Sequence, residues 1–143
     1  MKKKAAVLGL AIALVVLLYS AQASQTLRIE DRAWNMTLLL NGEGNVLACG
    51  PSWQEAYPDA AVVSLSCQAQ GGHLTLQGQK ETYTGTYQQA ERSQKDTVYQ
   101  VTVEGSTGQA VCSTTDHRTG EQAPTLVLTF PRDYTLYFTG TKP

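Results

Sequence analysis

The most restrictive feature of this sequence is its repeated alternation of apolar and polar residues in short runs, separated by glycine and asparagine. Such alternation is typical of half-buried β-strands, and no long helical period appears after Ala23. The runs predict roughly eight short strands in one domain. We therefore expect an all-β fold, either a single small antiparallel β-barrel or a β-sandwich. A barrel is slightly favoured because closure would remove exposed strand edges.

Two alternating runs open the part of the chain that should fold. The first, residues 26–30, predicts a half-buried strand with Leu27 and Ile29 on its inward face. The second predicts a strand on which four apolar residues share one face: Trp34, Met36, Leu38 and Leu40. Residues 41–45 are rich in glycine and asparagine and predict a turn, after which residues 46–49 return as the partner strand.

The N-terminus has the three parts of a secretory signal peptide: three lysines, an apolar run that ends at Tyr19, and the small residues of Ala21–Ala23. The apolar run is shorter than the about 20 residues of a membrane span, which disfavours the alternative, an uncleaved anchor. We therefore expect residues 1–23 to be removed as a signal peptide. Residues 24–143 should then form a single all-β domain, periplasmic or secreted, with no stable membrane anchor after cleavage.

Charge restricts the possible partners. The signal peptide contains three of the eleven basic residues, whereas all twelve acidic residues follow it, so the mature chain has a net charge of −4. Nucleic acids and anionic membrane surfaces are bound through basic patches. An acidic chain whose few basic residues are scattered is therefore expected to bind neither.

Three cysteines remain in a chain that should reach an oxidising compartment. We expect a disulfide between Cys49 and Cys67, because this pair closes a short loop between two predicted strands. Pairing of Cys112 with either of them is the alternative, and the leftover thiol is expected to be a small buried apolar group. The cysteine spacing matches no zinc motif, and the two histidines stand alone. No metal or other cofactor is therefore expected.

One helix signal lies between Cys49 and Cys67. Ser52 and Glu55 have the spacing of a capping box, and Pro58 prevents extension, which predicts one short helix near residues 52–57. Trp53 and Tyr57 are four residues apart and should share a face of this helix. They would either plug one end of the β core or form an exposed aromatic contact.

The only local cluster of catalytic residue types is Asp116, His117 and Arg118, close to Ser113. It lacks the Gly-x-Ser-x-Gly motif of a nucleophile elbow, and charged residues between strands are usually solvated. No acidic residue sits in an apolar run that would raise its pKa for acid–base work. We therefore expect that the protein is not an enzyme.

Export, small size and the lack of a catalytic set favour a periplasmic or secreted module that binds another protein. An enzyme inhibitor and a toxin-immunity protein are the narrower hypotheses, by analogy of size and compartment alone. A small-ligand carrier with a barrel interior and a structural or assembly subunit of the cell envelope are the alternatives. Two long loops and one outward strand position supply the candidate binding residues, chosen because such residue types dominate contact surfaces: Trp53, Tyr57, Asp116, His117, Arg118 and Tyr137.

Overall fold

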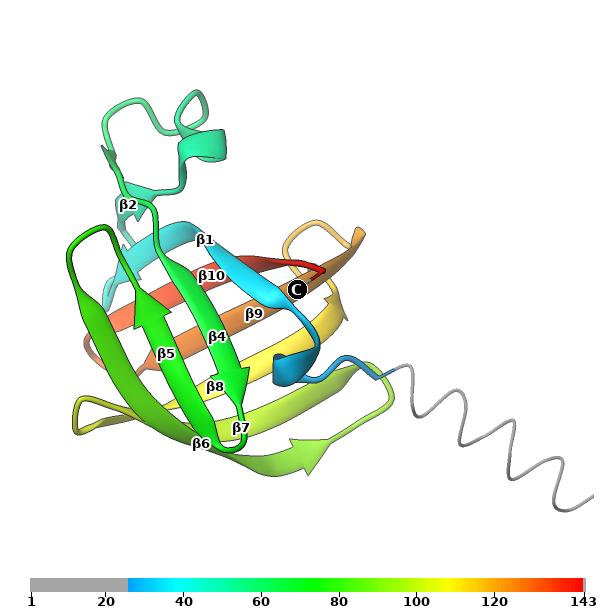
Figure 1. The fold of residues 1–143 in the computed structure, drawn as a ribbon. Coiled ribbons are helices and arrows are strands. Elements are labelled where there is room, and N and C mark those ends of the chain that lie inside the picture. Colours follow the sequence, from blue (N-terminus) through cyan, green and yellow to red (C-terminus); the bar gives the residue numbers. More distant parts are fainter. Residues whose placement is uncertain (1–25, 143) are drawn as a thin grey trace, which may run out of the picture.

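The computed structural model describes residues 26–142, so the expected signal peptide, residues 1–23, lies outside the described residues. The described chain is almost entirely β-structure (Figure 1). Its strands are β1 (Ala33–Asn41), β2 (Val46–Cys49), β3 (Ala61–Val62), β4 (Ser66–Gln70), β5 (His73–Gln77), β6 (Thr82–Arg92), β7 (Asp96–Val103), β8 (Ser106–Thr115), β9 (Gln122–Phe130) and β10 (Tyr134–Thr141).

Eight of these strands form a closed antiparallel barrel. From β4 to β10 each strand pairs with the next one in the sequence, and β1 closes the cylinder by pairing with both β10 and β4. The prediction of an all-β fold is confirmed, and of the two predicted architectures the structure has the β-barrel. Closure satisfies the hydrogen-bonding edges that an open sheet of this size would expose.

A bulge in β1 changes which residues face inward. The register against β10 shifts between Met36 and Leu38, so that the side-chain alternation changes phase at Thr37. Trp34 and Met36 belong to the barrel core as expected, but beyond the bulge it is Leu39 that packs against this core. The prediction that Leu38 and Leu40 continue the inward row is therefore wrong.

One end of the barrel is closed by the N-terminal segment. Where a strand was expected, the chain forms a short 3₁₀-helix, η1 (Ile29–Asp31). Leu27, which precedes this helix, and Ile29, its first residue, are both buried. The Ile29 N–H donates to the Tyr99 hydroxyl (3.2 Å), and the Trp34 indole N–H donates to the Ile29 carbonyl (2.7 Å). These bonds pair the buried polar groups that a strand ladder would otherwise have satisfied.

Residues 42–65 leave the barrel wall and form an excursion on its outside, seen at the top of Figure 1. Within it β2 pairs with the second half of β1, and the two-residue β3 pairs in parallel with β2. The helix expected near residues 52–57 is only a 3₁₀-turn, η2 (Pro51–Trp53), followed by hydrogen-bonded turns. Its N-cap is Gly50 and it has no side-chain cap, so the capping box from Ser52 does not form. Within residues 26–142 no helix is long and apolar enough to span a membrane.

Apolar side chains from strands around the barrel form its core. The two largest that are completely buried are Trp34 and Tyr99, close to η1. Above them the core includes smaller side chains from successive strands: Leu74, Leu76, Val101, Ala110, Cys112, Leu126, Leu128 and Phe138. Tyr87 meets Tyr99 edge to face, with ring centroids 5.6 Å apart.

All three cysteines are buried and unpaired, so the predicted disulfide between Cys49 and Cys67 is wrong. Both residues lie along the same edge of β1, because β10 occupies its other edge: Cys67 is opposite Trp34, and Cys49 is opposite Leu38. Four residues of strand separate these positions by roughly 13 Å, whereas a disulfide requires Cα atoms within about 7 Å. Burial raises the pKa of Cys67 to about 12 and raises that of Cys112 as well.

We expect the thiols to be inert in the folded protein, because the reactive species is the thiolate and burial disfavours it. A thiol reagent such as DTNB should react slowly with the native protein and should titrate three thiols after unfolding in guanidinium. Reductant should leave the melting temperature unchanged. A count of one thiol in the unfolded, unreduced protein would instead reveal a disulfide.

We expect the Trp34→Phe variant to lose about 2–3 kcal/mol of stability, because the buried carbonyl of Ile29 loses its donor and a small cavity forms. Urea unfolding measures this loss. Trp53→Phe is the matched control, since Trp53 lies outside the barrel core and should cost far less. Equal losses in the two variants would contradict the role of Trp34 in closing the barrel.

Candidate functional site

The excursion presents Trp53 and Tyr57 on the outside of the barrel. The Gly50 N–H donates to the Thr37 carbonyl (2.9 Å), and a Cβ at Gly50 would collide with the backbone of Met36, so only glycine fits this close approach. The Tyr57 N–H then bonds to the Trp53 carbonyl, one helical turn back. This turn stacks the two rings with centroids 6.3 Å apart. Both are half-buried and neither belongs to the core, so the interpretation that they plug the barrel is wrong.

The loop between β8 and β9 is organised by Asp116. Its backbone carbonyl accepts from the N–H groups of Thr119 and Gly120, and Gly120 adopts a positive φ of 77° to close the turn. Its carboxylate accepts from the backbone N–H of Arg118 (3.0 Å) and from two nitrogens of the Arg118 guanidinium (3.2 Å each). This two-point contact fixes the plane of the guanidinium.

The guanidinium of Arg118 joins the loop, the excursion and the barrel wall. Its central carbon lies 4.3 Å from the ring centroid of Tyr137, on the outer face of β10, and 5.7 Å from that of Trp53. Both distances are within the range of cation–π attraction. We call this cluster the aromatic–arginine patch; it consists of Trp53, Tyr57, Asp116, Arg118 and Tyr137.

The patch is close to neutral although it contains two charged groups. Burial raises the pKa of Asp116, but the hydrogen bonds and positive charge of Arg118 outweigh it, and the pKa lies below its ordinary value. The side chains of Arg118 and Asp116 are 29% and 13% exposed, so the ion pair is partly withdrawn from solvent. It therefore offers a partner flat aromatic and guanidinium surfaces rather than a net charge.

His117 turns away from the patch. Its Nε2 lies 3.0 Å from the Asp96 carboxylate and 3.2 Å from the Ser113 hydroxyl. A nucleophile–base–acid relay requires the serine and the acid on different ring nitrogens, whereas here both contact the same one. Ser113 is also buried, so the three residues do not form a hydrolytic triad. Burial raises the pKa of Asp96, but hydrogen bonds from Ser113 and His117 outweigh this and lower it.

The structure thus brings five of the six sequence-predicted binding residues into one patch and leaves only His117 out. Tryptophan, tyrosine and arginine are the residue types that dominate hot spots in protein interfaces. Within residues 26–142, no group of three or more histidine, cysteine or acidic side chains could hold a metal ion. The arrangement is suited to binding through stacking and hydrogen bonding.

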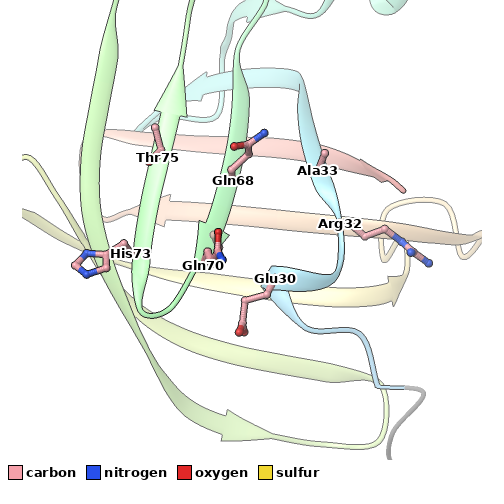
Figure 2. Close-up of a pocket in the computed structure, with 8 residues that line it drawn as sticks. Glu30, Arg32, Ala33, Gln68, Gln70, His73 and Thr75 are labelled. Carbon is pink, nitrogen blue, oxygen red and sulfur yellow. The ribbon is translucent and has the colours of Figure 1, made fainter. Parts of the chain in front are cut away.

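A separate polar cleft of about 690 Å³ lies on the outer wall, between η1, the start of β1 and the outward faces of β4 and β5. In Figure 2, Gln68 and Gln70 project from β4, while Arg32 and His73 point away from each other on opposite sides of the cleft. Because its ionisable side chains diverge, the cleft offers no converging set of groups for a ligand.

Sequence reasoning missed the open end of the barrel, where a hollow of about 440 Å³ is bordered by acidic and aromatic residues. The positions of acidic residues in the predicted hairpin turns could have indicated this site. In an up-and-down barrel every second hairpin turn lies at the same end, so the segments around Glu81, Glu104 and Asp133 had to be neighbours.

No protein-family model, curated protein or solved structure matches this chain. A β-barrel alone does not indicate a function, because unrelated activities share this architecture. The function must therefore be inferred from the residues of the site.

We expect the Asp116→Asn variant to be less stable than the wild type at pH 7 by about 1 kcal/mol, the scale of a partly buried ion pair. The lowered pKa of Asp116 means that its stabilisation is fully present above the ordinary aspartate pKa, about 3.9. The stabilisation is lost as the pH falls through the lower folded-state pKa. Urea unfolding of both proteins over a pH series should show the difference closing as the pH falls below the ordinary aspartate pKa. A difference that stays constant as the pH is lowered through the acidic range would contradict this assignment.

Proposed function

We propose that the protein is an exported protein-binding module, not an enzyme, and that its contact surface is the aromatic–arginine patch. The observation that carries this proposal is the meeting of two distant loops and one outward strand residue at Arg118. Arg118 contacts the rings of both Trp53 and Tyr137, so the β8–β9 loop is held against the excursion and the barrel wall instead of lying free in solvent. Such a cluster is the kind of anchor that buries well against a partner.

The same contacts hold the excursion against the barrel, which prepares the patch for binding. The rings of Trp53 and Tyr57 already stack on each other before a partner binds. Side chains that are ordered in advance lose less conformational entropy on association. Rigid aromatic side chains on a fixed scaffold are therefore favourable anchors.

The net charge of −4 on residues 24–143 favours a basic protein as partner, because opposite net charges accelerate association. Within that class, a basic exported enzyme that the module inhibits and a basic toxin that it neutralises are the narrower proposals. Both would place the partner's cationic side chains against the outer face of this acidic chain. A structural subunit of the cell envelope would bind its neighbours without this dependence on charge.

We expect Trp53→Ala or Arg118→Ala to weaken partner binding by about 2 kcal/mol or more, equivalent to about 30-fold in Kd. The partner is first captured from a periplasmic extract on the immobilised protein and then titrated in purified form by calorimetry. The fold should survive, because neither residue belongs to the barrel core.

Leu47→Ala and Lys95→Ala are the matched controls, since one removes an exposed apolar side chain of the excursion and the other an exposed charge that is not part of the patch. Both should bind as the wild type does. Normal binding by the Trp53 and Arg118 variants would exclude the patch as the contact surface. Unfolding of Trp53→Ala would show instead that the cluster serves stability.

A further inference from the structure

The two ends of the barrel differ. The end under η1 is filled by the side chains of Trp34 and Tyr99. The opposite end is formed by the β5–β6, β7–β8 and β9–β10 turns, which lie at the left side of Figure 1. This end opens into the hollow of about 440 Å³. This volume lies within the range of small-molecule sites. The walls of the hollow are inward-facing apolar side chains from five different strands: Met36, Leu39, Leu76, Val103, Phe130 and Leu136.

Large apolar side chains are exposed at the rim of this hollow. Five such side chains are exposed in the described chain, and three of them border it: Val63 (38%), Tyr83 (40%) and Tyr134 (49%). The tyrosines stand where β6 and β10 begin, beside two of the turns. Aromatic side chains around the entrance of an apolar hollow supply flat surfaces that can contact an organic ligand.

The charge at the rim has one sign. Glu81, Glu104 and Asp133 line the hollow, and no lysine, arginine or histidine is among its described lining residues. Glu81 accepts from the Tyr83 hydroxyl (3.3 Å), and the negative charges of Glu81 and Glu104 together raise the pKa of Tyr83. Lys80 and Arg132 belong to the same turns but do not line the hollow. A ligand entering here meets negative charge above an apolar floor.

The turns at this end hold strained backbone. Two non-glycine residues in the described chain have a positive φ, Glu104 (48°) and Arg132 (73°), and both lie in turns at the open end. The carboxylate of Glu104 accepts from the Thr84 N–H (3.0 Å), which ties its turn to β6. Asparagine or glycine would adopt this conformation more readily. Strain that persists beside a hollow is typical of ligand sites.

We propose that the open end of the barrel binds a small organic cation with an apolar body, such as a hydrophobic amine, with the body on the leucine- and phenylalanine-lined floor and the cationic group among the rim carboxylates. Charge complementarity and the two rim tyrosines select a cation, since an ammonium group is attracted both to carboxylates and to aromatic faces. The three carboxylates do not form a metal site, because they are not close enough together to hold an ion. This site is separate from the aromatic–arginine patch on the outer wall.

Calorimetric titration with three probes of equal chain length tests the proposal: octylamine, octanol and octanoate at neutral pH. Octylamine should bind at least about tenfold more tightly than octanol, and octanoate should show no binding. Added salt should weaken the binding of octylamine but not that of octanol. Amide chemical-shift changes in NMR spectra should cluster at Tyr83, Glu104 and Tyr134.

The double variant Glu81→Gln, Glu104→Gln should bind octylamine about as weakly as octanol, while its affinity for octanol stays at the wild-type value. Glutamine keeps the acceptor that bonds to Thr84, so the turn should survive. The matched control is the double variant Glu91→Gln, Glu121→Gln, which removes two charges at the closed end and should bind octylamine normally.

Three results would overturn the proposal. One is a failure of all three probes to bind, and another is a preference for octylamine that persists in the Glu81/Glu104 variant. The third is loss of protein-partner capture by that variant when the wild type binds no alkylamine, which would assign the open end to a protein instead.

Discussion

The barrel and the excursion both depend on which strands pair with the two hydrogen-bonding edges of β1. One edge pairs with β10 over the full length of the strand, while the other is shared: Trp34 and Asn35 pair with β4, and Leu38 to Leu40 pair with β2. The first pairing closes the barrel. The second lifts residues 42–65 onto the outer wall, where Trp53 comes within reach of Arg118. Fold closure and the position of the patch are therefore two consequences of one strand.

The local sequence pattern was sufficient to predict the class of fold, but not which side chains of β1 face the barrel interior. Alternation and turn composition are properties of a few neighbouring residues, and they were sufficient to predict roughly eight short strands in one domain. The bulge at Thr37 and the burial of Leu27 under a 3₁₀-turn depend on long-range pairing with β10 and Tyr99. The expected disulfide failed for the same reason: closeness in sequence says nothing about which strand edge two cysteines share.

The residues of the patch were predictable by type and the patch itself was not. Loop length and aromatic content singled out Trp53, Tyr57 and Arg118, but only the folded chain shows that they meet. Asp116 and His117 are neighbours in the sequence, yet one binds Arg118 and the other reaches Asp96 on β7. At the open end the failure was avoidable, because the alternation of hairpin turns in a meander already assigns the acidic residues to one end.

The unequal packing of the two barrel ends explains how one small domain can hold two surfaces. At the closed end, buried polar groups of Ile29, Trp34 and Tyr99 satisfy each other, and the large rings leave little space. Stability concentrated there allows the other end to keep exposed tyrosines, clustered carboxylates and positive-φ turns, each of which weakens a fold locally.

The aromatic–arginine patch and the open end also differ in charge. The patch neutralises Arg118 with Asp116, whereas Glu81 and Glu104 face the solvent at the rim without a basic residue among the lining side chains. Neutral stacking surfaces suit the flat contact of a protein, and a negative ring above an apolar floor suits a small cation.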